Sequence, residues 1–144
     1  MSKQPFVIER SFKAPVTAVW QAISDVEKMK AWYFDMEGFK PEVGTAFTFT
    51  GCGTKGDKYV HLCRVLAVIP EQMISYSWAY DGFPGSSVVT IELEAEGTGT
   101  RLKLTHAGLE TFGTDNPDFA AGSFASGWTQ IIGTSLGAYL TAEQ

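Results

Sequence analysis

The chain has 144 residues, of which 44% are hydrophobic and 19% charged, and its formal net charge is −5. This length and composition predict a single globular domain over residues 1–144, with its own hydrophobic core, and argue against disorder. No cluster of Lys or Arg interrupts the acidic balance. Nucleic acid and anionic membrane surfaces are therefore poor partners, because binding to phosphate needs concentrated positive charge.

The cysteine and histidine pattern predicts no metal site and no cofactor. Cys52 and Cys63 are the only cysteines and form no CxxC motif. His61 shares a strand face with Cys63, but two ligands do not make a metal site. We expect free thiols in a cytoplasmic, reducing compartment, since no signal peptide is visible. The uncharged segment 119–142 is about half Gly, Ser, Thr and Gln, so we expect no membrane span.

The first elements in the chain are predicted to be one strand and two short helices. Residues 6–13 alternate between apolar and polar, which indicates a strand, and Arg10 falls on its apolar face. Apolar residues then recur at helical spacing over residues 16–23. The run Ser24-Asp25-Val26-Glu27 matches a capping box and predicts the start of a second helix, which turns Trp32 or Tyr33 inward.

A long stretch with an apolar period of two follows. Apolar residues alternate with small or polar ones from Val43 to His106, and short turns rich in Gly interrupt the alternation. This pattern predicts five strands joined as an antiparallel meander. The predicted strands are residues 43–49, 59–69, 73–78, 89–93 and 101–106.

The chain is predicted to end in a long helix that begins near Asn116-Pro117-Asp118. Its apolar stripe consists of Phe124, Trp128, Ile131, Ile132, Leu136, Tyr139 and Leu140. Gly127, Gly133 and Gly137 lie within this helix, and each costs about 1 kcal/mol relative to Ala. The helix therefore has to be held by packing against a sheet.

These elements predict an α+β fold in the order β-α-α-β5-α. The six antiparallel strands are expected to form a curved sheet that wraps around the C-terminal helix. One helix cannot fill the concave face of such a sheet. We therefore expect a cavity between the helix and the sheet, of the kind in which apolar ligands bind.

Four stretches, spread over nearly the whole chain, carry a resemblance to a known family. They are Ala14-Pro15 with Val19-Trp20; Arg64-Val65-Leu66 through Pro70 to Tyr76-Ser77-Trp78; Gly99-Thr100-Arg101-Leu102 to Thr105-His106-Ala107-Gly108; and Gly127-Trp128-Thr129-Gln130-Ile131-Ile132-Gly133 through Leu136 to Tyr139-Leu140. In these stretches the sequence resembles the SRPBCC superfamily, also called START-like or Bet v 1-like. Within it, the chain is most similar to homologues of the C-terminal domain of the activator of the 90-kDa heat-shock protein ATPase.

The resemblance implies a helix-grip fold and either ligand binding or a stress-related role, but no set of catalytic residues. The eukaryotic activators carry a separate N-terminal domain that the chain lacks. This difference counts against activation of the ATPase and leaves docking to a chaperone through the C-terminal-type domain open.

Six residues are candidates for lining the expected cavity: Arg10, Trp32, Tyr76, Trp78, His106 and Trp128. Aromatic walls with a few polar tips are typical of small-ligand sites, although core packing also explains most of the aromatic residues. His106 lies on an apolar strand face, either as a buried imidazole with a fixed hydrogen bond or as a polar anchor in the cavity wall. Arg10 is either solvated at the end of the sheet or placed at the cavity mouth, where it would clamp a carboxylate.

Three functions remain open from the sequence. The first is a cytosolic domain that binds a hydrophobic small molecule or lipid between sheet and helix. The second is a stress-response protein that docks to the 90-kDa heat-shock chaperone through its surface. The third and weakest is an enzyme of the cyclase or hydrolase type, although the sequence shows no catalytic constellation and we expect no catalysis.

Overall fold

The backbone forms an antiparallel sheet of six strands in the order β1-β6-β5-β4-β3-β2. A computed structural model of the chain describes residues 5–33, 36–52, 58–83, 85–112 and 121–143. The strands are β1 (Phe6–Phe12), β2 (Ala46–Cys52), β3 (Lys58–Ile69), β4 (Met73–Tyr80), β5 (Ser87–Glu96) and β6 (Gly99–Ala107). Strands β2 to β6 pair with their chain neighbours, which confirms the predicted meander, and β1 adds to the sheet beside β6.

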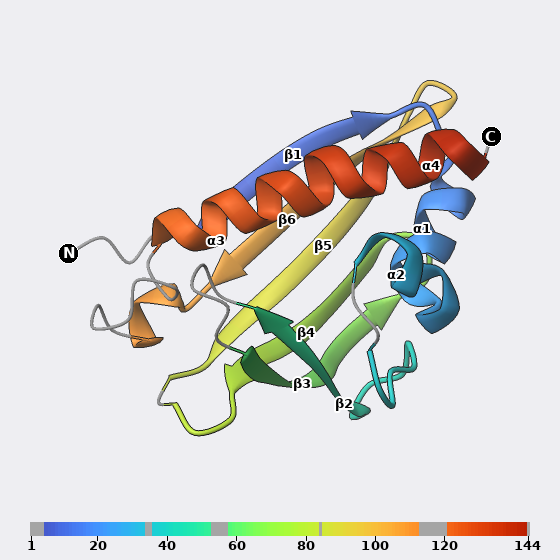
Figure 1. The fold of residues 1–144 in the computed structure, drawn as a ribbon. Helices are drawn as coiled ribbons and strands as arrows, with labels where there is room; N and C mark the ends of the chain where they lie inside the picture. The colour runs from blue at the N-terminus through green and yellow to red at the C-terminus, as the bar shows by residue number, and fades with distance from the viewer. Residues whose placement is uncertain (1–4, 34–35, 53–57, 84, 113–120, 144) are drawn as a thin grey trace.

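The helices cover one face of this sheet. The two short helices α1 (Val16–Ser24) and α2 (Val26–Trp32) lie together at one end of it (Figure 1). Three segments, α3 (Ala121–Trp128), the π-helical η3 (Thr129–Leu136) and α4 (Gly137–Glu143), run end to end as one long helix. This C-terminal helix crosses the concave face of the curved sheet, as the α+β helix-grip prediction requires (Figure 1). A short 3₁₀ helix, η1 (Leu109–Phe112), follows β6.

The buried side chains of the C-terminal helix recur at every fourth residue: Phe124, Trp128, Ile132, Leu136 and Leu140. Each residue of an α-helix turns by about 100°, so a spacing of four drifts by about 40° at every step. Such a drift would carry the later side chains away from the sheet. The hydrogen bonds of a π-helix reach one residue further along the chain and widen the turn. The η3 segment thereby keeps all these side chains on the face that packs on the sheet.

Two local predictions were wrong. The N-cap of α2 is Asp25, whose carboxylate accepts from the backbone N–H groups of Glu27 (2.9 Å) and Lys28 (3.4 Å). The predicted cap, Ser24, still belongs to α1 and donates to the carbonyl of Trp20. Strand β2 begins at Ala46 rather than at the predicted Val43, which lies in a loop and is 67% exposed. The predicted helix start at 116–118 lies outside the described residues.

One hydrophobic core lies between the helices and the sheet. Within the described part of the chain, every buried side-chain nitrogen or oxygen has a hydrogen-bond partner. In the same residues, no helix is both long and apolar enough to cross a bilayer. No three His, Cys, Asp or Glu side chains of this part of the chain gather where they would hold a metal ion.

Candidate functional site

Five of the six predicted site residues belong to one aromatic cluster on the concave face. Trp78 is the centre of this cluster, with ring centroids 5.1 Å from His106 and 5.5 Å from Trp128. The other two predicted residues, Trp32 and Tyr76, are linked to the cluster through Tyr33. The Tyr33 ring stacks on Trp32 at 5.1 Å, and its hydroxyl lies 3.2 Å from that of Tyr76. The five predicted residues are all buried. Whether they contact a ligand stays a prediction.

A chain of hydrogen bonds runs through the centre of the cluster. The Trp128 indole Nε1–H donates to His106 Nδ1 at 3.0 Å, and an indole N–H can only donate. Nδ1 of the neutral His106 ring is therefore unprotonated, and Nε2 carries the hydrogen. Nε2–H then donates to the Ser87 hydroxyl at 2.8 Å, and that hydroxyl donates to the carbonyl oxygen of Trp78 at 2.9 Å. His106 is thus a buried imidazole with both nitrogens bonded.

The same series of hydrogen bonds argues against nucleophilic catalysis by Ser87. A serine within 2.8 Å of a histidine is the spacing of a nucleophile and its general base. Here the facing nitrogen of His106 already carries its proton, and the hydroxyl hydrogen of Ser87 points to the carbonyl oxygen of Trp78. Burial, together with the smaller effect of the nearby His61, lowers the pKa of His106 to about 3. A base this weak does not take a proton from serine at neutral pH.

His61 is a member of the cluster that the sequence did not single out as a site residue. Its ring stacks on Phe49 at 4.1 Å and meets Trp78 and Tyr80 edge-on, with centroids at 4.8 and 4.7 Å. Its Nδ1 lies 3.1 Å from the carbonyl oxygen of Tyr59. Burial lowers the pKa of His61 to about 4. The sequence contained a signal for this position, because the period of two along β3 places His61 on the same face as the buried side chains of that strand.

Tyr33, which the sequence offered as an inward-facing residue but not as a site residue, lies at the other end of the cluster. Its hydroxyl is paired with that of Tyr76, and burial raises the pKa of both phenols above the ordinary value. Burial likewise raises the pKa of the Cys63 thiol to about 12. Since only a thiolate is strongly nucleophilic, Cys63 is an inert core residue at neutral pH.

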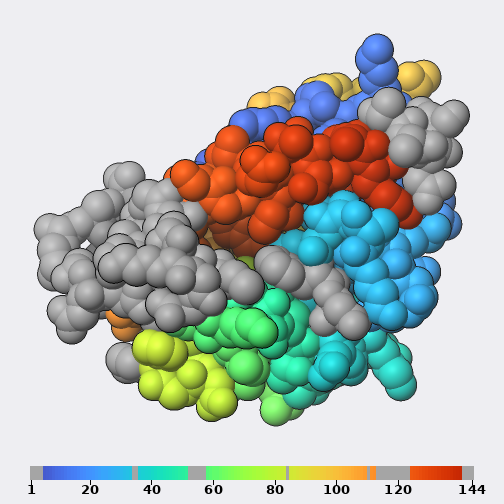
Figure 2. Space-filling view, in the orientation of Figure 1, coloured from blue at the N-terminus to red at the C-terminus, as the bar shows by residue number. Residues whose placement is uncertain are grey.

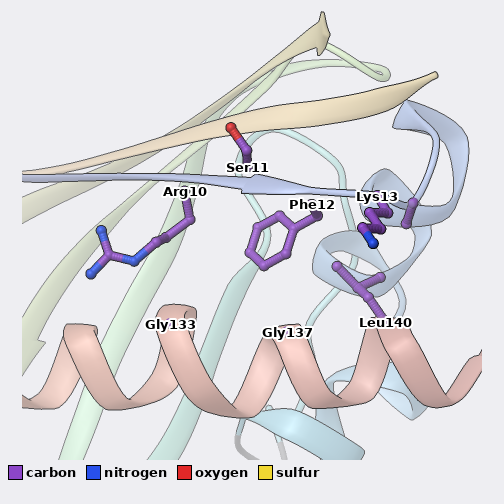
Figure 3. A pocket seen from close by; sticks show the side chains of 8 residues that line it. Arg10, Ser11, Phe12, Lys13, Gly133, Gly137 and Leu140 are labelled. Atoms are coloured by element: carbon purple, nitrogen blue, oxygen red, sulfur yellow. The ribbon is translucent and has the colours of Figure 1, made fainter. Parts of the chain in front are cut away.

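Arg10, the sixth predicted residue, lies apart from the aromatic cluster. It lines a pocket of about 550 Å³ between β1 and the C-terminal helix, together with Ser11, Phe12, Lys13, Ala14, Gly133, Gly137 and Leu140. Arg10 and Phe12 point from β1 toward the helix (Figure 3). In the space-filling view, β1 lies directly beside this helix (Figure 2). The pocket therefore opens along the edge of the sheet, and the five buried candidates do not line it.

The glycines of the C-terminal helix form one wall of this pocket. A Cβ atom added to Gly133 would lie 3.5 Å from Nε of Arg10, and one added to Gly137 would lie 3.7 Å from the Phe12 ring. Both are ordinary van der Waals distances, so the backbone itself does not require glycine here. The absence of side chains instead leaves the space open. Gly127 differs, because nothing lies within 4 Å of its Cβ position and it is exposed.

The fold matches those of several solved structures over nearly the whole of this chain. Protein MLL2253 from Mesorhizobium loti is 30% identical, with a TM-score of 0.81 over 98% of this chain and 99% of that one. Protein CV1439 from Chromobacterium violaceum is 22% identical, with a TM-score of 0.81 over 96% of this chain and 98% of the other. CalU16 from Micromonospora echinospora is 26% identical, with a TM-score of 0.74 over 94% of this chain and 73% of its own.

The family assignment rests on the sequence as well as on the fold. No curated protein matches the chain. The model of the family described as "Activator of Hsp90 ATPase homolog 1-like protein" matches residues 13–141. That range contains strands β2 to β6 and every described helix except the last two residues of α4, and the whole of β1 precedes it. The chain belongs to the family of Activator of Hsp90 ATPase homolog 1-like proteins, within the helix-grip SRPBCC superfamily.

Proposed function

We propose that the protein is a cytosolic binding module for a hydrophobic small molecule, and that the ligand lies between β1 and the C-terminal helix. The observation that carries this proposal is the pocket of about 550 Å³ beside Gly133 and Gly137. Its volume is in the range of small-molecule sites, roughly 300–1,000 Å³. Phe12 and Leu140 supply apolar surface, on which burial of a ligand is favourable by roughly 25 cal/mol per Å².

Binding without catalysis fits the chemistry of the described side chains. Arg10 and Lys13 are the charged side chains that line the pocket, and its described lining holds no His, Asp or Glu, the residues that most often act as general acids or bases. The histidines are in the aromatic cluster, where Nδ1 of His61 and both ring nitrogens of His106 are hydrogen-bonded within the protein. We therefore propose that the protein holds its ligand and leaves it chemically unchanged.

Filling the pocket from its glycine wall is expected to abolish binding. In Gly137→Leu, the new side chain would occupy the space beside Phe12. We expect the wild type to bind the neutral probe N-phenyl-1-naphthylamine saturably, in the micromolar range, and Gly137→Leu to bind it at least tenfold more weakly. Fluorescence titration measures both. Gly127→Leu is the matched control, because it adds the same side chain to the same helix in open space.

Two results would contradict the proposal. One is a wild type that binds no hydrophobic probe saturably. The other is a Gly127→Leu variant that loses as much affinity as Gly137→Leu, since the helix rather than the pocket would then be responsible. Thermal melting of each variant shows that it remains folded.

Docking to a heat-shock chaperone is a second candidate, and the convex face of the sheet favours it. Strand β3 exposes Val60, Leu62 and Leu66 there, each with 40–43% of its surface accessible. Exposed apolar side chains that lie close together are typical of protein interaction sites. The family is also described by its relation to the activator of the Hsp90 ATPase.

Residues 1–144 alone are expected not to stimulate the ATPase of the 90-kDa chaperone. The sequence resemblance is to the C-terminal domain of the eukaryotic activators, and it does not extend to their separate N-terminal domain. An ATP-turnover assay with the purified pair tests this expectation. A dose-dependent rise in turnover would contradict it, and a Leu62→Asp variant would then show whether the convex face is the surface involved.

A further inference from the structure

The pocket beside β1 is cationic, although the chain as a whole is acidic. The net charge is −5, yet the described residues that line the pocket include Arg10 and Lys13 and no carboxylate. From these residues, an anionic group entering the pocket would meet positive charge only. Cationic walls of this kind also raise the local concentration of anions.

The guanidinium of Arg10 retains donors for such a group. Its one hydrogen bond in the described structure runs from Nη1 to the carbonyl oxygen of Glu9, at 2.8 Å. The carboxylate of Glu9 points to the other face of the sheet, where it pairs with Arg101 at 2.8 Å. A guanidinium has five N–H donors in a planar fork that matches a carboxylate. Arg10 is therefore placed to hold a carboxylate with two parallel hydrogen bonds.

The pocket has a direction along β1. Arg10 is level with Gly133, and Phe12 is level with Gly137 two residues further along the strand. Leu140 continues the apolar wall beyond Phe12, and Lys13 lies beside it at the edge (Figure 3). Ala14 also lines the pocket. From Gly133, which lies beside Arg10, to Leu140 the helix advances by roughly 10 Å, at about 1.5 Å per residue. An extended hydrocarbon chain of about ten carbons has a similar length, since each C–C bond of about 1.5 Å advances it by slightly less.

We infer that the ligand is an amphipathic carboxylate of medium chain length, with its head group on Arg10 and its tail along Phe12, Gly137 and Leu140. This inference rests on the proposed function, because it assigns the ligand class of the same pocket. The planar fork favours Arg10 over Lys13 as the head-group residue, since an ammonium binds a carboxylate only as a point charge.

Decanoic acid and decanol are the probes that test the inference, because they share a tail and differ in the head group. Each is titrated against protein-bound N-phenyl-1-naphthylamine at pH 8 and low salt. We expect the wild type to bind the acid at least tenfold more tightly than the alcohol. Arg10→Gln is expected to remove this preference and to leave the affinity for decanol within twofold of the wild type.

Two control variants locate the charge that matters. Lys103→Gln removes one positive charge from β6 outside this pocket, so it is expected to retain the full preference for the acid. Lys13→Gln is expected to retain most of it. A preference lost equally in Lys103→Gln would overturn the inference, because net charge would then be the cause. A preference lost only in Lys13→Gln would also overturn it.

The remaining outcomes separate the inference from the proposed function. Equal binding of acid and alcohol by the wild type would overturn the carboxylate inference and leave the hydrophobic pocket in place. Equal weakening of both probes in Arg10→Gln would overturn it as well, because Arg10 would then only shape the wall. No displacement by either probe, together with no binding of N-phenyl-1-naphthylamine, would overturn the proposed function itself.

Discussion

Replacing Trp128 by alanine is expected to destabilise the protein by about 3–5 kcal/mol, the usual cost of truncating a buried tryptophan. The Trp128 side chain is 3% exposed and contacts the rings of Tyr33, Trp78 and His106. The truncation removes these contacts, and it leaves Nδ1 of His106 buried without its donor. The free energy of unfolding in urea, compared with that of the wild type, measures the effect.

Trp128→Phe separates packing from hydrogen bonding. Phenylalanine keeps an aromatic ring against the sheet but has no N–H for His106. Leaving a buried acceptor unsatisfied costs about 1–3 kcal/mol, so this variant is expected to lie between the wild type and Trp128→Ala. A loss below about 1 kcal/mol for Trp128→Ala would contradict the anchoring role of this residue, since full burial predicts several times more.

Acidification from pH 7 to pH 5 is expected to destabilise the protein by about 4 kcal/mol through its two histidines alone, about 2 kcal/mol from each. Burial lowers the pKa of His61 to about 4 and that of His106 to about 3. The unfolded chain binds protons on both rings as the pH falls below about 6.5, whereas the folded protein binds them only near pH 4 and pH 3. The stabilisation is therefore complete above pH 6.5 and is lost progressively as the pH falls to those values.

Urea unfolding at half-unit steps between pH 7 and pH 5 measures this loss. His61→Phe is the informative variant, because phenylalanine retains a ring beside Phe49, Trp78 and Tyr80 and has no titratable group. We expect the pH-dependent part of its stability to fall to about half that of the wild type, since each histidine contributes about 2 kcal/mol. A free energy of unfolding that stays constant between pH 7 and pH 5 in the wild type would mean that the two rings are exposed to solvent.

Much of the fold was predictable from local sequence patterns. The apolar period of two marked the strands, and the helical spacing of Trp128, Leu136 and Leu140 marked the C-terminal helix, because burial on one face imposes these periods. Errors arose where local signals compete. Ser24 and Asp25 are both good capping residues, and only the position at which α1 ends decides which of them caps α2.

The candidate site was predictable only in part. The alternation along the strands placed Trp78 and His106 on inward-facing positions, and the helical spacing did the same for Trp128. The structure brings these three rings together. The sequence pattern did not distinguish these residues from Arg10, which also lies on an apolar strand face but is apart from their cluster. Along β1 the face of a side chain follows from the period of two. Whether that face meets an aromatic ring or a glycine depends on which part of the helix crosses it.

The sequence by itself determined the α+β class, the meander and the inward faces, because these depend on contacts between residues close in the chain or on a simple period. Only the tertiary structure decided which ring nitrogen of His106 carries the hydrogen, because its hydrogen-bond partners Ser87 and Trp128 are 19 and 22 residues away in the sequence. The same holds for the pocket, whose two walls, β1 and the C-terminal helix, lie at opposite ends of the chain. Hydrogen bonds and cavities of this kind arise where distant segments meet, and no local period records that meeting.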